Sequence, residues 1–336
     1  MNKFCVSVCI SVHNTATFLP RCLNSVISQT LENIEIILVN NGSTDNSEQI
    51  MREYQEKYFE HRISIITQED RGLALGRQRG IEAAHGDYIV FLDADDFVLP
   101  QAYENMYNYA IQNNLDIVEI QSYYGNKILS SQFEGIHEGK EMLKLYFKGH
   151  PGTFPMLWLR LYKRHLFDKP VMPMLYVNNE DIFAFPCLLY NADKIGYLKE
   201  TLHNYSIDNE NAVMTSLSRK LDLAKKYYEN RILTLFVVAH IKDYIGEDNI
   251  NRSYKNEFIQ FKYRVIISFI FSNIHNISYK EKLKKVKQIF GFKDNRELHK
   301  YTRKNCDNRG RLNKVIKIFG IRNAYIILKM YNMVVK

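Results

Sequence analysis

The sequence predicts an α/β protein in which a mostly parallel sheet is flanked by helices and followed by a helical C-terminal extension. Through about the first hundred residues, short apolar runs typical of buried strands alternate with segments of helical period. Such alternation indicates parallel strands joined by right-handed crossovers. From about residue 217 the pattern becomes helical, polar and rich in Lys and Tyr. We therefore expect one domain over residues 1–215 and a helical, basic region over residues 216–336.

The first predicted elements follow one another closely. Residues 6–12 form an apolar run that predicts the first strand. Residues 16–29 carry apolar side chains at intervals of three and four, which predicts a helix with one buried side. Residues 34–39 predict a second strand. The turn after it includes Asp45, which can cap a helix over residues 48–58.

The same alternation continues to about residue 120. A third strand is predicted over residues 63–67, a helix over 73–84 and a fourth strand over 88–92. Another helix and strand follow, over residues 101–112 and 115–120. Between about residues 125 and 215 five prolines interrupt the pattern, and we expect irregular structure there.

The net charge of +8 is unevenly distributed. Residues 280–336 contain 17 Lys or Arg and 4 Asp or Glu, so this tail carries +13 and the rest of the chain −5. Between Arg309 and Lys329, basic and apolar residues alternate at helical spacing, which suits a helix lying in an anionic membrane interface. Two alternatives are a helical subdomain that packs its apolar stripe inward and a tail that caps a homodimer. We expect no nucleic-acid partner.

Cysteine usage and the N-terminus bear on the compartment. The five cysteines form no C-x-x-C pair, which predicts thiols in a reducing compartment. The chain enters its first strand without a charged and apolar leader, so we expect no signal peptide. The longest apolar runs, at 232–239 and 265–271, suit buried helices rather than membrane spans. These features predict a cytoplasmic protein, attached peripherally to the inner face of the cell membrane if its tail docks there.

The most informative motif is Asp93-Ala94-Asp95-Asp96, directly after the fourth predicted strand. It places three carboxylates in a loop at the C-terminal end of a strand, where open α/β sheets bind their ligands. Clustered carboxylates repel one another unless a positive group joins them, and Mg²⁺ or Mn²⁺ is a common solution that also recruits phosphate oxygens. The alternative is a solvated acidic turn.

Four segments in this order and spacing resemble the family 2 glycosyltransferases of the GT-A fold. They cover residues 6–14, 28–47, 72–81 with 86–96, and 158–164 with 179–181. The resemblance runs from about residue 4 to 215 and is similar to bacterial enzymes that build capsule, lipopolysaccharide or other surface glycans. It implies an inverting, metal-dependent transfer of a sugar from a nucleotide-sugar to a hydroxyl of a glycan or lipid-linked glycan.

The resemblance implies a role for each acidic motif. Asp95 would bind the metal that bridges the donor's two phosphates, Asp93 would lie near the ribose or the metal, and Asp96 would support them. The Glu180-Asp181 pair matches the family's catalytic pair. Asp181 would be the general base, and Glu180 would contact donor or acceptor. Taken alone, the pair could be a charge pair at a helix N-terminus.

By the same resemblance, the nucleotide pocket would use Ser11, His13, Asn14, Asn41 and Arg77. The family usually has Tyr where this chain has His13, and Asp where it has Asn41. An Asn can accept the uracil N3 proton, and it can also donate a proton to other bases. A UDP-sugar remains the first choice of donor, although the departures at His13 and Asn41 weaken that choice and admit other bases. His13 could equally be a partly buried strand-end histidine, and Gln78 replaces the family's usual Asn.

Several further residues have more than one interpretation. Arg160 and Trp158 lie where the family contacts the diphosphate or the acceptor, and Trp158 could instead anchor the core. His203 could be a third metal ligand or pack against neighbours. Arg71 and Arg79 could be surface charges.

Two other functions remain open from the sequence. A sugar-nucleotide nucleotidyltransferase shares the nucleotide-binding architecture but carries a Gly-rich, basic loop after its first strand, which this chain lacks. A non-catalytic nucleotide-sugar-binding protein of the same fold would have no need of carboxylates at both Asp95 and Asp181.

Overall fold

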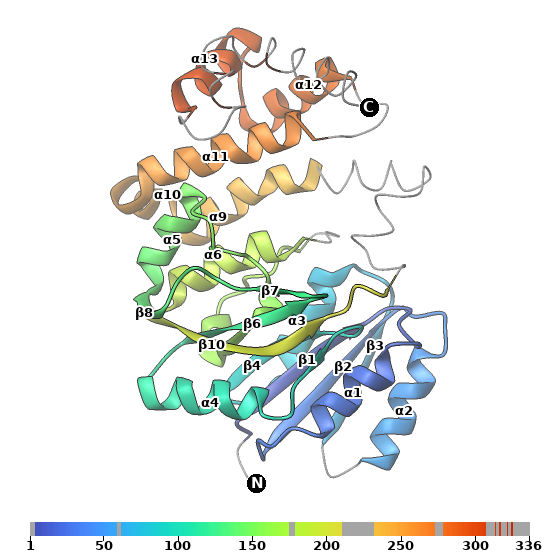
Figure 1. The fold of residues 1–336 in the computed structure, drawn as a ribbon. Coiled ribbons are helices and arrows are strands. Elements are labelled where there is room, and N and C mark those ends of the chain that lie inside the picture. Colours follow the sequence, from blue (N-terminus) through green and yellow to red (C-terminus); the bar gives the residue numbers. More distant parts are fainter. Residues whose placement is uncertain are drawn as a thin grey trace. The chain divides into compact units, whose positions relative to one another are not determined.

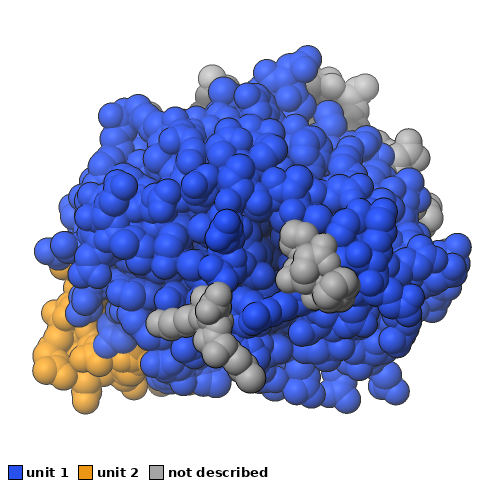
Figure 2. Space-filling model, turned by 90° about the horizontal axis from the view of Figure 1, so that it is seen from below, with its two compact units in different colours: residues 1–143, 150–219 blue, residues 144–149, 220–336 orange. Residues whose placement is uncertain are grey.

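A computed structural model describes residues 4–58, 62–174, 179–209, 232–272 and 278–306, together with residues 313, 316, 321 and 324. The chain forms two compact units, which Figure 2 shows in different colours. Unit 1 comprises residues 1–143 and 150–219, and unit 2 comprises residues 144–149 and 220–336. The predicted domain boundary at 215/216 lies outside the described residues.

Unit 1 is built on one sheet, whose described strands run in the order β3-β2-β1-β4-β9-β6-β10-β5, with β7 beside β6 and β8 beside β10. The strands are β1 (Val6–Val12), β2 (Ile34–Asn41), β3 (Ile63–Gln68), β4 (Tyr88–Asp93), β5 (Phe97–Val98), β6 (Ile117–Tyr124), β7 (Lys127–Leu129), β8 (Gly135–Glu138), β9 (Arg160–Lys163) and β10 (Lys194–Tyr205). The four strands β3, β2, β1 and β4 pair in parallel, as do β6 and β10. The mostly parallel α/β architecture predicted from the sequence is confirmed.

Helices cover both faces of the parallel strands (Figure 1). Side chains from α1 (Leu19–Ile27), α2 (Ser47–Lys57) and α4 (Ala102–Asn113) share one hydrophobic core with the alternate β1 residues Val6, Val8, Ile10 and Val12. The opposite face of β1 meets α3 (Leu73–Ala83). There Gly76 and Gly80 allow close approach, since a Cβ at Gly76 would lie 2.4 Å from Oγ of Ser11.

The stretch expected to be irregular contains regular elements. Besides β7 to β10 it holds α5 (Gly139–Lys148) and α6 (Asp181–Asn191). β9 lies between β4 and β6 and pairs antiparallel with both. The expectation was wrong here because β7, β8 and β9 are only 3 or 4 residues long, too short for a periodic pattern. In addition, β8 and β9 pair with strands distant in sequence.

Unit 2 is helical in its described residues. It contains α9 (Val237–Ile245), α10 (Glu247–Asn249), α11 (Lys255–Ile270), α12 (Tyr279–Phe290) and α13 (Asn295–Asn305). Its core includes Tyr263, Ile266 and Leu298, and the tail residues Ile316, Ile321 and Ala324 are fully buried in the same cluster. Most of the predicted basic interfacial helix between residues 309 and 329 lies outside the described residues. Among the helices that were described, none has both the length and the apolar character needed to cross a membrane.

Candidate active site

The sheet register brings the predicted site residues to one edge. β1, β2 and β4 are parallel, so their C-terminal ends meet at the same edge of the sheet. Ser11 on β1 lies opposite Asp93, the last residue of β4. Asn41 ends β2, and His13 and Asn14 follow β1 directly. This edge is where ligands bind in open α/β sheets.

The acidic loop after β4 is tightly held. The Asp96 backbone N–H donates to the Asp93 carbonyl at 3.0 Å, which closes a turn. Asp96 is buried, and its Oδ1 accepts from the Ser206 N–H at 2.8 Å. Oδ2 of Asp95 accepts from the Asn209 side chain at 2.7 Å. Burial, followed by the charges of Asp96 and Asp93, raises the pKa of Asp95 to about 6, so this loop concentrates negative charge that is poorly solvated.

Arg77 connects this loop to the predicted catalytic pair. Its Nη2 donates to Oδ1 of Asp93 at 2.6 Å, and its Nη1 forms an ion pair with Oε1 of Glu180. The Arg77 side chain is only 5 % exposed. Burial raises the pKa of Glu180 to about 7, against the opposing effect of Arg77. Because Glu180 immediately precedes α6, this bridge fixes the start of that helix beside the end of β4.

Asp181 is the first residue of α6 and is half-buried. Its Oδ1 accepts from the Ile182 N–H at 2.8 Å. Burial raises the pKa of Asp181, and the nearby Arg77 guanidinium opposes that rise. A carboxylate with a raised pKa is a stronger base than one in water, and that is the property a general base requires.

Removal of Arg77 is expected to destabilise the fold. Arg77→Ala would leave Asp93 and Glu180 without their shared cation, and breaking a buried ion pair typically costs about 3–5 kcal/mol. We expect that loss in the free energy of unfolding measured with urea. Arg79→Ala is the matched control on the same helix, since Arg79 is exposed and forms an ion pair with the exposed Glu82 at 3.0 Å. Its effect should stay within about 0.5 kcal/mol. Equal losses in the two variants would contradict a special role for the bridge.

His13 and Asn14 organise the loop that follows β2. The His13 Nδ1 lies 2.8 Å from the Asn41 carbonyl oxygen. Asn14 has a φ of 52° and its Oδ1 accepts from the backbone N–H of Thr44 at 2.7 Å and of Asp45 at 3.3 Å. Asp45 in turn accepts from the N–H of Ser47, the first residue of α2, at 3.0 Å, but the N-cap position itself is occupied by Asn46, so Asp45 supports the turn before the helix and is not its N-cap. These residues therefore shape the pocket edge, and their contact with a nucleotide stays a prediction.

Asn41 is directed away from open space. It is 3 % exposed, its Oδ1 accepts from Gln68 Nε2 at 2.7 Å, and its Nδ2 donates to Oδ1 of Asp70 at 3.4 Å. The backbone N–H of Arg71 also donates to Asn41 Oδ1, at 3.3 Å. A direct contact between Asn41 and a base would require these bonds to rearrange. Nothing in the sequence assigns Asp70 to the site. Its contact with Asn41 becomes evident only in the structure, where two loops distant in sequence approach each other.

Arg160 lies deeper than the sequence analysis expected. It is 1 % exposed, and its Nε donates to Oε2 of Glu119 at 2.8 Å. Its Nη2 donates to Glu119 and to the Phe154 carbonyl, both at 2.5 Å, and its guanidinium lies 4.0 Å from the Phe185 ring centroid. These contacts make Arg160 a structural cation, and its predicted contact with the donor stays a prediction.

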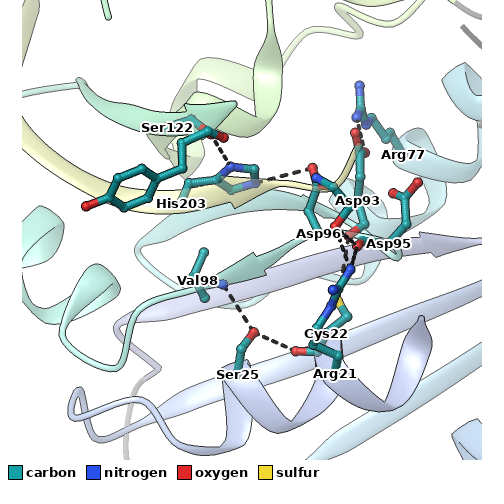
Figure 3. Close-up of polar contacts among 12 residues, drawn as sticks. Arg21, Cys22, Ser25, Arg77, Asp93, Asp95, Asp96, Val98, Ser122 and His203 are labelled. Atoms are coloured by element: carbon teal, nitrogen blue, oxygen red, sulfur yellow. Dashed lines mark hydrogen bonds and ion pairs between the residues drawn. The ribbon is translucent and has the colours of Figure 1, made fainter. Parts of the chain in front are cut away.

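Trp158 and His203 stack on each other, with ring centroids 4.6 Å apart. The His203 Nδ1 lies 2.8 Å from Ser122 Oγ, and its Nε2 lies 3.4 Å from Oδ2 of Asp96 (Figure 3). Burial lowers the pKa of His203 to about 4, which keeps the ring neutral. These contacts are typical of a packed side chain, and through Asp96 they support the acidic loop.

Arg21 was missed by the sequence analysis. Its Nη2 donates to the Asp95 carbonyl at 3.0 Å and to Ser206 Oγ at 2.6 Å, and its Nη1 lies 3.4 Å from Asp208. Arg21 therefore joins α1 to the acidic loop (Figure 3) and also to the segment after β10. The local sequence around Arg21 does not indicate a role at the site, because the loop and the segment that Arg21 contacts are more than 70 residues away.

The donor set of the acidic loop fits a hard divalent cation. Among the described residues no group of three or more His, Cys, Asp and Glu side chains could hold a metal ion. Mg²⁺ and Mn²⁺, however, are often held by one or two carboxylates, with phosphate oxygens and water completing the coordination. Asp95 and Asp93 supply such carboxylates, and Arg77 contacts a single oxygen of Asp93. The poorly solvated negative charge on Asp95 is of the kind that a cation stabilises.

Known proteins resemble this chain in sequence and in fold. The family profile described as glycosyl transferase family 2 matches residues 7–169. EpsH of Bacillus subtilis (strain 168), which is named as a glycosyltransferase, is 30% identical over 253 residues that cover 72% of each chain. A crystal structure of S. aureus TarS in complex with UDP superposes with a TM-score of 0.67 at 17% identity, covering 98% of this chain and 92% of that one. The mannosyltransferase PcManGT from Pyrobaculum calidifontis, solved with GDP-Man and Mn²⁺, has a TM-score of 0.52 at 13% identity over 99% of this chain and 88% of that one.

The sequence matches decide the family, and the structural matches, at lower identity, bear on the fold alone. EpsH is matched over more than two thirds of its length, and the family profile covers β1, β2, β4 and the acidic loop that follows β4. The sequence resemblance stated above is therefore confirmed. This chain belongs to glycosyltransferase family 2 and has the GT-A fold.

Proposed function

We propose that this glycosyltransferase inverts the anomeric centre, depends on a divalent cation and takes its sugar from a UDP-sugar. The observation that supports this most directly is the Arg77 bridge. It holds the Asp93 end of the acidic loop and the Glu180-Asp181 pair at one site, although 84 residues of sequence lie between Asp95 and Glu180. A donor diphosphate at the acidic loop and a base at Asp181 would then flank the same anomeric carbon.

In this proposal Asp181 accepts the proton of the acceptor hydroxyl as that oxygen attacks the anomeric carbon. Burial raises its pKa, which makes it a stronger base than a carboxylate in water. Glu180 is held by Arg77 and so positions the start of α6, which carries Asp181. Arg77, already engaged with two carboxylates, acts as a positioning residue and would reach a phosphate only by giving up one of them.

Asp95 and Asp93 would hold the cation, as the donor set allows. A bound divalent cation neutralises the charge that develops on the leaving diphosphate. The PcManGT structure contains Mn²⁺, which supports the proposal of a metal-dependent enzyme of this fold. The choice between Mn²⁺ and Mg²⁺ is left to a titration with each metal.

The nucleotide base of the donor and the identity of the acceptor are proposed on different grounds. TarS binds UDP and UDP-GlcNAc in its crystal structures, which supports a UDP-sugar, whereas PcManGT binds GDP-Man. We propose a growing bacterial surface glycan, free or lipid-linked, as the acceptor, and docking of the basic tail to an anionic membrane as its means of access. Binding of the full-length chain to anionic vesicles at low salt tests the tail.

The anomeric configuration of the product tests the proposed mechanism. Asp181 is the one carboxylate assigned to the acceptor face, and no second nucleophilic carboxylate is assigned, so a single displacement with inversion is expected. NMR coupling constants of the product, compared with those of the donor, measure the outcome. Retention of configuration would contradict the role given to Asp181.

A further inference from the structure

A row of four aromatic side chains leads from the acidic loop to the surface of unit 1. We define the aromatic row as His203, Trp158, Tyr205 and Tyr124. Trp158 stacks on His203, and its ring centroid lies 5.5 Å from that of Tyr205. Tyr205 stacks on Tyr124 at 5.4 Å with an interplanar angle of 25°. The rings therefore form one continuous series.

The sheet register explains why the row forms. In the parallel pairing of β6 and β10, Ser122 lies opposite His203 and Tyr124 lies opposite Tyr205. Successive side chains of a strand point to opposite faces, so His203 and Tyr205 share one face of β10. The hydrogen bond between Ser122 and His203 and the stacking of Tyr124 on Tyr205 both belong to that face. Trp158 covers the two β10 rings.

One end of the row touches the reaction centre and the other reaches solvent. His203 Nε2 lies 3.4 Å from Oδ2 of Asp96. Burial, followed by the charges of Asp96, Asp93 and Asp95, raises the pKa of Tyr205 to about 12. At the far end, Tyr124 is 51% exposed.

We propose that the aromatic row is an acceptor subsite that binds a sugar ring of the acceptor glycan by stacking on Tyr124 and Tyr205. This inference rests on the proposed function, because the row borders the loop to which the donor is assigned. Tyr and Trp present flat apolar faces with polar edges, which match the CH face and the hydroxyls of a sugar. A lipid chain offers no hydroxyls, whereas the exposed Tyr124 and the half-buried Tyr205 present polar edges as well as apolar faces. Occupation by glycan would place the acceptor beside the acidic loop, which His203 of the row contacts.

The chain offers a direct readout, since Trp158 is its only tryptophan. The experiment titrates the full-length protein with cellobiose, maltose and N,N′-diacetylchitobiose and follows Trp158 emission. Tyr124→Ala is the test variant. Tyr123→Ala is the matched control, because Tyr123 is the preceding residue of β6, is 38% exposed and faces the opposite side of the sheet. Thermal unfolding checks that both variants remain folded.

We expect at least one disaccharide to change the emission saturably. Its Kd should rise about tenfold in Tyr124→Ala, the loss expected for one aromatic stacking contact, and stay within about twofold in Tyr123→Ala. No saturable change with any of the three sugars, or equal weakening in both variants, would overturn the subsite. A further titration uses micelles of a short-chain phosphatidylcholine. If the micelles change the emission and none of the three sugars does, the row is a lipid site and the proposal is overturned.

Calorimetry with UDP and Mn²⁺ on the same wild-type protein separates this inference from the proposed function. If UDP fails to bind, the proposed donor is wrong whatever the sugars do. If UDP binds and the sugars leave Trp158 unchanged, the subsite alone is wrong.

Discussion

Asp181→Asn is expected to abolish sugar transfer while leaving donor binding intact. The amide keeps the shape of the carboxylate but cannot accept the acceptor's proton, and removal of a general base costs about 10² to 10⁴ in rate. UDP-sugar affinity should change little, because the base acts on the acceptor hydroxyl and not on the nucleotide. Single-turnover transfer and calorimetric titration with the donor measure the two quantities separately.

Glu180→Gln provides the comparison for this variant. Glu180 is paired with Arg77, so its replacement should lower stability and weaken the positioning of α6 more than it changes the chemical step. If Asp181→Asn transfers at a rate near that of the wild type while Glu180→Gln is inactive, the base has been assigned to the wrong carboxylate of the pair.

Asp95→Ala is expected to remove metal-supported activity. A cation at the leaving diphosphate supplies several kcal/mol of transition-state stabilisation, and its loss corresponds to about 10² to 10⁴ in rate. The wild-type enzyme should likewise lose activity in excess EDTA and recover it when Mn²⁺ is restored. Turnover by the wild type that persists in excess EDTA would rule out the metal-dependent mechanism.

Asp95→Asn distinguishes a lost metal from a damaged loop. The loop's backbone contacts with Arg21 and Ser206 use the Asp95 carbonyl, so the isosteric side chain leaves them in place. We expect a folded protein whose melting temperature no longer rises with Mn²⁺ and UDP together, whereas that of the wild type does. A wild-type-like response of Asp95→Asn to Mn²⁺ would place the metal elsewhere.

Much of unit 1 could be predicted from the sequence. The strands from β1 to β4 and the helices between them follow from local periodicity, because a buried strand or an amphipathic helix must place its apolar residues at regular intervals. The acidic loop after β4 could be located for the same reason, since it directly follows a run of buried apolar residues. Local pattern failed beyond residue 125, where β9 is four residues long and its partners β4 and β6 precede it by tens of residues.

The sequence by itself determined the fold class, the family and the residue types at the site, because motif order and apolar periodicity are properties of the chain. Only the tertiary structure decided how the side chains are used. It joined Arg77 to Asp93 and Glu180, buried Arg160 against Glu119, and turned Asn41 toward Asp70. It also aligned Tyr124 with Tyr205 across β6 and β10. Each of these depends on which charges and rings meet in a low-dielectric interior, and that is set by packing between segments distant in sequence.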